Sequence, residues 1–71
     1  MSKYKINDFK KGDEVYHLSN RSLKMVVIEI NVDLNEITCR WLDKNGSIQT
    51  IGFMAEELGK SIDLRPTIMS L

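Results

Sequence analysis

The segment around Asn45-Gly46 constrains the fold of this chain most. Asparagine and glycine tolerate the positive φ that tight β-turns require, so Asp43–Gly46 predicts a hairpin loop. The residues before it, Glu36–Leu42, alternate between apolar and polar side chains with period two, as a half-buried strand does. We therefore expect a β-hairpin whose second strand runs from about Ser47 to Phe53.

The register of this hairpin follows from the length of its loop. A four-residue loop places Trp41 opposite Ile48, so that apolar side chains meet on one face. Gly52 then interrupts the second strand, and a glycine inside a strand often marks a bulge or a barrel corner. We expect a sharp bend at Gly52 that turns Phe53 inward.

Other segments add further elements. Lys24–Ile30 is rich in β-branched residues and has apolar groups on both faces, which is typical of a central strand. Val15–Leu18 reads as a first strand, and the polar residues Ser19–Ser22 as the loop after it. Met54–Leu58 before Gly59 predicts one helical turn. Ile62–Arg65 predicts a closing strand.

These elements predict a mostly-β protein, a small and strongly bent five-stranded barrel with one short helical turn near the C-terminus. A three-stranded sheet with separately packed ends is the alternative. The 71 residues suffice for one hydrophobic core, so we expect a single domain over 1–71. The barrel would span about 9–65, with an N-terminal arm at 1–8 and a tail at 66–71.

Charge and cysteine content indicate a cytoplasmic protein outside the membrane. Ten basic and ten acidic residues cancel, although Lys3, Lys5, Lys10 and Lys11 make the first dozen residues locally basic. Cys39 is the only cysteine, which excludes an internal disulfide and favours a reducing compartment. The N-terminus is too charged for a signal peptide, and no apolar run approaches the roughly 20 residues of a membrane span.

Several motifs together resemble a known family. They are Phe9-Lys10-x-Gly12-Asp13-x-Val15, Lys24-Met25-x-Val27, Thr38-Cys39-Arg40-Trp41-Leu42-Asp43, and Phe53 before an acidic helical turn. The chain resembles the YodC-like small bacterial proteins of unknown function over about Phe9 to Leu64, and the Cys-x-Trp pairing is the specific part. Ser19–Leu23 lacks the family's usual glycines and proline, and Met54 stands where proline is common. The resemblance implies an SH3-like fold and brings no activity, ligand or catalytic residue.

For the side chains that could take part in catalysis, we favour a structural interpretation. His17 has no partner nucleophile or carboxylate that the sequence places beside it, so it reads as an ordinary strand residue. Cys39 lies between Ile37 and Trp41 at period two and reads as a small buried filler. Neither a set of metal ligands nor a glycine-rich phosphate loop appears. We therefore expect no catalytic residue, metal or cofactor, and no enzyme.

Trp41 is the residue that most deserves weighing as a binding residue. A tryptophan of a small barrel lies in the core or at the rim of a groove that binds peptides or bases, and the core is favoured here. If Trp41 does lie at a rim, Tyr16 and Arg40 would extend the surface. Tyr16, Arg40 and Trp41 are thus the candidate binding surface.

Binding is the function that these observations favour. We expect a non-catalytic binding or adaptor module that acts through contacts with a protein partner. The alternative is a nucleic-acid-associated barrel that uses the lysine-rich arm, and the neutral net charge counts against it. Its other basic residues would be Arg21, Lys24 and Arg40. A homodimer through the apolar C-terminal tail is a further expectation, and the tail's apolar residues are Ile62, Leu64, Ile68, Met69 and Leu71.

Overall fold

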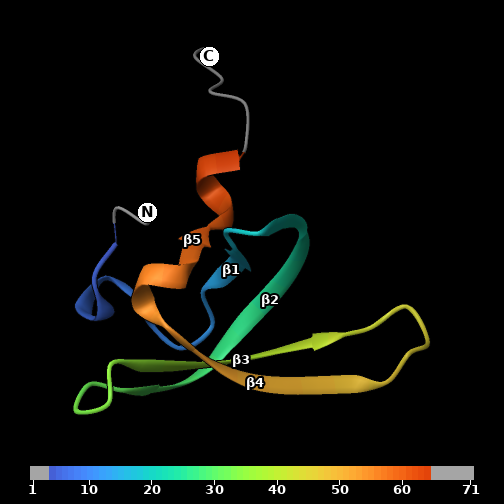
Figure 1. The fold of residues 1–71 in the computed structure, drawn as a ribbon. Helices are drawn as coiled ribbons and strands as arrows, with labels where there is room; N and C mark the ends of the chain where they lie inside the picture. Colours follow the sequence, from blue (N-terminus) through green and yellow to red (C-terminus); the bar gives the residue numbers. More distant parts are fainter. Residues whose placement is uncertain (1–3, 65–71) are drawn as a thin grey trace.

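The computed structural model describes residues 4–64, which form one five-stranded antiparallel sheet in the order β4-β3-β2-β1-β5 (Figure 1). The strands are β1 (Glu14–His17), β2 (Asn20–Asn31), β3 (Glu36–Leu42), β4 (Ile48–Met54) and β5 (Leu58–Lys60). Three short 3-10 turns accompany them: η1 (Ile6–Asp8), η2 (Ala55–Glu57) and η3 (Ser61–Leu64). The prediction of a mostly-β fold with five strands is confirmed. Within residues 4–64 no ladder joins β4 to β5, so the sheet is not closed.

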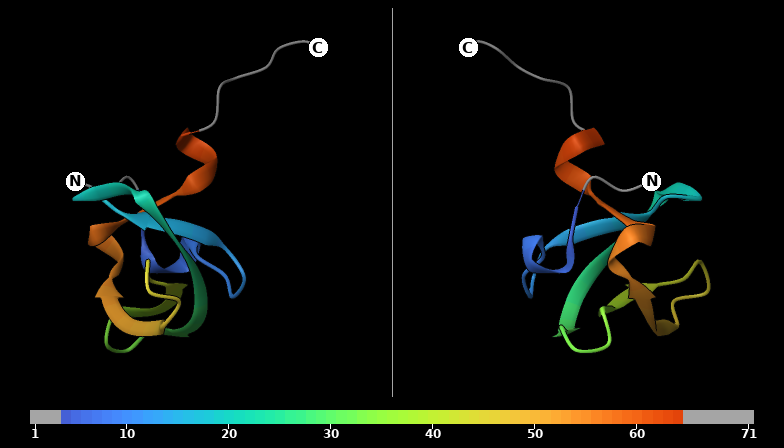
Figure 2. Two further views of the ribbon diagram at one scale, coloured as in Figure 1. Left: turned by 90° about the vertical axis from the view of Figure 1, so that its right-hand side faces the viewer. Right: turned by 60° about the vertical axis from the view of Figure 1, so that its left-hand side comes forward.

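The long strand β2 belongs to both halves of the sheet. Its first half pairs with β1 and its second half with β3, and Val26 is the residue that pairs on both sides, with Glu14 and with Arg40. Ile28 is an extra residue in the ladder with β3, which makes a bulge and increases the local bend. Figure 2 shows how strongly β2 curves. The prediction of a central strand over Lys24–Ile30 is confirmed.

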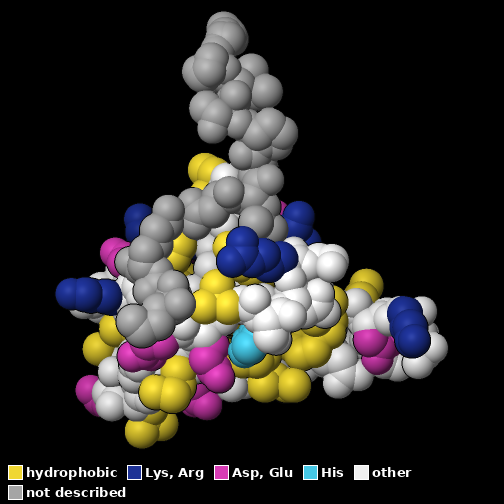
Figure 3. All heavy atoms as spheres, turned by 45° about the horizontal axis from the view of Figure 1, so that its top comes forward, with side chains coloured by type: hydrophobic (Ala, Val, Ile, Leu, Met, Phe, Trp, Pro, Cys, Tyr) yellow, Lys and Arg dark blue, Asp and Glu magenta, His cyan; other side chains and the backbone are white. Residues whose placement is uncertain are grey.

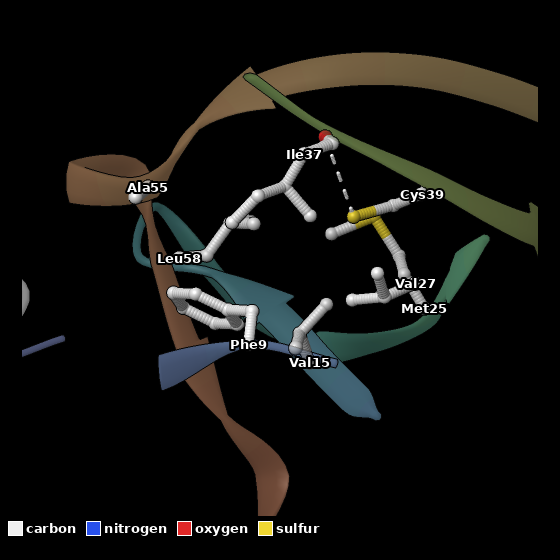
Figure 4. Packing of buried hydrophobic residues seen from close by; sticks show 8 residues of the cluster. All are labelled: Phe9, Val15, Met25, Val27, Ile37, Cys39, Ala55 and Leu58. Carbon is white, nitrogen blue, oxygen red and sulfur yellow. Dashed lines mark hydrogen bonds between the residues drawn. The ribbon is translucent and has the colours of Figure 1, made fainter. Parts of the chain in front are cut away.

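The hydrophobic core lies on the concave side of this bent sheet. Alternate residues of each strand point inward, and the fully packed set is Phe9, Val15, Met25, Val27, Ile37, Cys39, Ala55 and Leu58 (Figure 4). The bulge at Ile28 changes the alternation in β2, so that Ile30 packs against the core although it lies three residues after Val27. Every strand except β4 therefore supplies a fully buried side chain.

The segment before β1 is attached to this core. Phe9 is buried, and the ring of Tyr4 lies against it in an edge-to-face arrangement with centroids 5.6 Å apart. The Lys60 Nζ atom lies 5.2 Å from the Tyr4 ring centroid and 5.7 Å from that of Phe9. Residues 4–8 of the expected N-terminal arm thus pack through Tyr4, while Lys5 remains exposed.

The predicted hairpin loop is present, but the predicted register is wrong by one residue. Leu42 pairs with Ile48, so Trp41 lies opposite Gln49 and not opposite Ile48. The loop therefore contains five residues. Because a shift of one residue exchanges the two faces of a strand, Phe53 points inward as part of the regular alternation. The ladder of β4 with β3 continues through Gly52 without a register shift, so there is no bulge at the position where a bulge or a barrel corner was predicted.

Two other boundaries also differ from the predictions. Ser19–Ser22 is not a loop throughout, because β2 already begins at Asn20 and the turn is confined to Leu18 and Ser19. The closing strand is Leu58–Lys60. Of the predicted strand Ile62–Arg65, residues 62–64 lie in the 3-10 turn η3, and Arg65 lies outside the described residues. The helical turn is present as η2. The tail at 66–71 lies outside the described residues.

Candidate functional site

The loop end of the β3–β4 hairpin extends beyond β2, the third strand that supports the rest of the hairpin. The ladder between β2 and β3 stops at the pair Val26 and Arg40, because β2 continues from there along β1. Trp41 and Leu42 consequently pair with β4 alone among the described residues. Figure 1 shows this end of the hairpin reaching away from the other strands. The hairpin beyond Arg40 is therefore two-stranded.

One face of the hairpin end is apolar and exposed. Leu42 and Ile48 are direct cross-strand partners, and they are 64% and 63% exposed. Cross-strand neighbours of this kind present one continuous apolar area. Isolated exposed apolar residues are ordinary on a protein surface, but a paired set on a projecting element is a candidate contact site.

The opposite face of the hairpin carries the aromatic residues. Of its apolar residues, only Trp41 lies at the end that β2 does not reach, because Ile51 and Phe53 pair with a part of β3 that β2 still supports. Trp41 on β3 and Phe53 on β4 are half-buried, with ring centroids 6.5 Å apart. Ile51, on the same face of β4 as Phe53, is 46% exposed. The ring of Phe53 also lies 5.2 Å from that of His17. Figure 3 shows hydrophobic side chains gathered beside the histidine. We call Trp41, Leu42, Ile48, Ile51 and Phe53 the hairpin surface.

The loop of the hairpin is held by Asp43. Its Oδ1 atom accepts hydrogen bonds from the backbone N–H groups of Asn45 at 2.8 Å and Ser47 at 3.0 Å, and its Oδ2 atom accepts one from the Gln49 side chain at 2.8 Å. The hydrogen bond from Gln49 is the main cause that lowers the pKa of Asp43, and that from Ser47 comes next. Gly46 has a φ of 84°, which suits glycine. The loop therefore fixes the hairpin surface in one geometry.

His17 has closer partners than the sequence indicated. Its Nδ1 atom lies 2.7 Å from the Ser19 Oγ atom and accepts a hydrogen bond from the Ser19 backbone N–H at 3.1 Å. Since Nδ1 is an acceptor, the proton of the neutral ring is on Nε2. That atom lies 3.8 Å from the Glu57 Oε2 atom. The backbone N–H of Leu18 also donates to the Glu57 carbonyl at 2.9 Å, so His17 helps to attach the β1–β2 turn to η2.

Cys39 is fully buried in the core. Its thiol lies 3.9 Å from the carbonyl oxygen of Ile37, a weak hydrogen bond drawn as a dashed line in Figure 4. Burial raises the pKa of Cys39 to about 11, which disfavours the thiolate that a nucleophile requires. This placement agrees with the interpretation of Cys39 as a small buried residue.

The structure does not bring the three candidate residues into one surface. Trp41 points toward the concave side of the sheet, whereas Arg40, its neighbour in β3, points to the convex side. Tyr16 also faces the convex side but is only 4% exposed, because it packs against Gly59. Only Trp41 belongs to the hairpin surface, which is made of apolar residues on both faces of the hairpin. Arg40 shares a face with Leu42 but is charged, and Tyr16 is buried on β1. Leu42, Ile48 and Ile51 were missed, although their apolar side chains on both sides of the turn were a usable signal.

Basic residues surround Tyr16 on the convex side. The Arg21 guanidinium lies 5.7 Å from the Tyr16 ring centroid, and Lys24 is the direct cross-strand partner of Tyr16. Arg40 follows on the same side of the sheet, where it pairs with Val26. Three of the basic residues considered for nucleic-acid binding therefore share one face, and Glu14 lies on it too.

A separate polar depression of about 270 Å³ lies at the end of β5. It is lined by Asp13, Glu14, Lys60, Ser61 and Ile62, and the Lys60 Nζ atom is 3.6 Å from Asp13 Oδ2. The Ser61 Oγ atom is buried and has no hydrogen-bond partner among the described residues. No group of three or more histidine, cysteine or acidic side chains that would hold a metal ion occurs within residues 4–64.

Comparisons with known proteins add no relative. Family models, curated proteins and solved structures were searched, and none of them matches the chain. In the portion of the chain that the structure covers, no helix has the length and apolar character needed to cross a membrane.

Proposed function

We propose that this protein is a non-catalytic binding module that contacts a protein partner through the hairpin surface. The observation that carries the proposal is the two-stranded hairpin end, which has apolar residues on both faces and a loop fixed by Asp43. A two-stranded hairpin has little stability of its own in water. Covering its apolar faces with a partner would stabilise it, and the fixed loop would lower the entropy lost on binding.

The fold that we propose for this module is a partly open, SH3-like small barrel. Support comes from the strand order, from the strand β2 that both halves of the sheet share, and from the 3-10 turn η2 between β4 and β5. A partly open barrel of this kind leaves β4 and β5 as edge strands, because no ladder joins them within residues 4–64. Membership of the YodC-like family and a cytoplasmic location are further parts of this proposal, and both rest on the sequence.

The test compares two leucines of nearly equal exposure. Leu42 belongs to the hairpin surface and is 64% exposed, whereas Leu34, in the turn between β2 and β3, is 67% exposed. Leu42→Ser and Leu34→Ser should leave stability almost unchanged, which circular dichroism would check. Proteins captured from a host lysate by the wild type should be retained by Leu34→Ser and lost by Leu42→Ser.

A quantitative measurement follows once a partner has been captured. Trp41 is the only tryptophan and lies in the hairpin surface, so its fluorescence should change when the purified partner binds. We expect Leu42→Ser to weaken this binding by roughly tenfold, the effect of about 1.4 kcal/mol. Equal affinities of the wild type, Leu42→Ser and Leu34→Ser would contradict the proposal.

A second candidate function is nucleic-acid binding through the convex side. It is supported by the placement of Arg21 and Lys24 beside Tyr16 and of Arg40 on the same face. Fluorescence anisotropy with short DNA and RNA at low salt would test it. Binding that weakens with salt, and that Arg21→Gln together with Lys24→Gln removes, would favour this function. No binding at low salt would exclude it.

A further inference from the structure

The outer edge of the sheet at β4 lacks the features that usually protect an exposed strand. β4 has seven residues, Ile48–Met54, and within residues 4–64 it pairs only with β3. It contains no charged residue and no proline, and its ladder with β3 has no register shift. Natural edge strands are usually blunted by lysine, proline, a bulge or shortness. The other edge strand, β5, is only three residues long.

The exposed apolar residues of β4 are arranged symmetrically along the strand. Ile48, Ile51 and Met54 are 63%, 46% and 52% exposed, and Ile51 is the central residue of the seven. A strand that pairs antiparallel with an identical strand does so about a two-fold axis, and each residue then meets the residue at the mirrored position. The positions of these three residues therefore suit pairing with a second copy of the same strand.

We propose that β4 pairs antiparallel with β4 of a second copy of this chain, about a two-fold axis that passes through Ile51. In this register Ile51 meets Ile51 of the partner subunit, and Ile48 meets Met54 of the partner subunit. Each of the seven residues of β4 lies opposite a residue of the partner strand. The open backbone groups of the edge form hydrogen bonds along it, except the Met54 N–H, which already donates to the Glu57 Oε1 atom at 3.0 Å.

The faces of the sheet also agree with this register. Opposed residues of an antiparallel pair lie on the same face of the sheet, so a two-fold pairing must place each even-numbered residue opposite an even-numbered one, and each odd-numbered residue opposite an odd-numbered one. An axis through any one residue, such as Ile51, meets this condition. Centring on Thr50 or Gly52 would leave part of the strand unpaired and would place Ile48 or Met54 opposite the smaller Gly52 or Thr50. β4 contains no charged residue, so no like charges of the two strands meet in any of these registers.

This inference rests on the proposed function, because it assigns a second copy of the chain as the partner at two residues of the hairpin surface, Ile48 and Ile51. Pairing would add another strand beside the hairpin end, where β3 has lost its contact with β2. The two sheets would become one continuous sheet across the two-fold axis. Two-sided support of this kind stabilises a hairpin that is otherwise open on its β4 side.

The oligomeric state provides the first test. Thr50 is exposed and pairs with Arg40, so Thr50→Glu places opposite charges side by side within one subunit. In the dimer, however, position 50 meets Gly52 of the partner subunit. Glu36 lies against Gly52 in each subunit, so the new carboxylate would face a like charge. Asn7→Glu, in η1, is the control with the same change in net charge.

Sedimentation equilibrium over a range of concentrations should show a dimer for the wild type and for Asn7→Glu. We expect Thr50→Glu to raise the dimer dissociation constant by about tenfold or more, because the symmetric interface contains the substitution twice. A wild type that stays monomeric up to millimolar concentration would overturn the inference. A dimer that Thr50→Glu leaves unchanged would overturn it as well.

Cysteine cross-linking provides the second test, which reports the register. Opposed residues of an antiparallel pair have Cα atoms about 4.5–5.5 Å apart, within the range that a disulfide spans. Ile51→Cys should therefore form a disulfide-linked dimer under mild oxidation. Ile48→Cys alone should not, because its two copies would lie roughly 20 Å apart in this register. A mixture of Ile48→Cys and Met54→Cys should form the mixed dimer. All of these variants are made in a Cys39→Ala background, because Cys39 is the direct cross-strand partner of Ile51 and would compete for a disulfide with Ile51→Cys within one subunit.

The possible results separate this inference from the proposed function. If Ile51→Cys does not cross-link and the protein stays monomeric while Leu42→Ser loses a captured protein, the inference fails and the proposed function stands. If cross-linking follows the proposed register, the inference stands. A cross-link of Ile48→Cys to itself would overturn the register and with it the inference.

Discussion

Gly59 on β5 lies directly against the ring of Tyr16 on β1, its cross-strand partner. A Cβ atom at position 59 would lie 2.6 Å from both the Cζ and the Oη atoms of Tyr16, closer than real Cβ contacts come. The tyrosine is buried, so its ring has little room to move. The absence of a side chain at position 59 is thus a requirement of packing, because it lets a large ring lie flat on the closing strand.

Gly59→Ala should destabilise the protein by about 1–3 kcal/mol, the usual cost of overpacking. Urea denaturation followed by circular dichroism measures this change. Combining it with Tyr16→Val, which removes the ring, should give a loss smaller than the sum of the two single losses, because the clash is then absent. Additive losses in the double variant would show that the ring is not the cause.

Gly52→Ala should behave differently. The atoms that a Cβ at position 52 would meet belong to the end of the flexible Glu36 side chain, which can move into solvent. The backbone of Gly52 does not have the left-handed φ that favours glycine, and its pairing with Thr38 is regular. We expect a change in unfolding free energy within about 0.5 kcal/mol, measured by the same denaturation. A loss above about 2 kcal/mol would indicate that the strand needs glycine for a bend.

The thiol of Cys39 should be unreactive in the folded protein. Burial raises its pKa to about 11 from the ordinary value of 9.0, so the neutral form dominates at neutral pH and the reagent has no access. We expect a thiol reagent such as DTNB to react with Cys39 only on unfolding. Because the folded pKa is the higher one, its contribution to stability is constant below about pH 9 and is lost as the pH rises toward 11. Rapid reaction of the native protein at pH 7.5 would be inconsistent with this placement.

Asp43→Asn should lower the melting temperature at neutral pH. The substitution removes the charge that accepts hydrogen bonds from Gln49 and Ser47. The pKa of Asp43 is lowered in the folded protein, so its contribution is present above the unfolded value of 3.8 and is lost as the pH falls through the folded value. The melting temperatures of wild type and variant should therefore converge at acid pH.

Asp33→Asn, in the turn between β2 and β3, serves as the control for this experiment. Its melting temperature should follow that of the wild type at each pH. If Asp43→Asn behaved like Asp33→Asn at neutral pH, the hydrogen bonds of the loop would not contribute to stability.

Period-two alternation accounts for the part of the fold that the sequence predicted well. Glu36–Leu42 is a strand with the predicted boundaries, because Ile37, Cys39 and Trp41 need one apolar side to pack against. The turn with its positive φ at Gly46 was also predictable, since few residues adopt that conformation.

The register of the hairpin was not predictable from alternation alone. Loops of four and five residues both begin at Asp43, and the choice depends on where its carboxylate finds hydrogen-bond donors. Asp43 accepts from the backbone of Ser47, which draws Ser47 into the loop. That one residue decides that Ile51 and Phe53, and not Ile48, share a face with Trp41.

The candidate site was predictable only in part, for a related reason. Alternation correctly implies that Arg40 and Trp41 point to opposite sides of β3. The residue at which the β2–β3 ladder ends depends on how far β1 and β3 each extend along β2. This is a property of the tertiary structure, which alternation does not predict. Leu42 and Ile48 became candidates only when the structure showed β2 leaving β3 at Val26.

The strand β2, shared at Val26, also bears on how the protein unfolds. Because one continuous strand joins the two halves of the sheet, detachment of β2 leaves only the two-stranded ladders β1–β5 and β3–β4, which have little stability of their own. Opening of β2 and global unfolding are therefore one event, and amide protons of β1 and β3 that pair with β2 should exchange with solvent at a common rate. Amide protons at the far end of the hairpin, which β2 does not reach, should exchange faster.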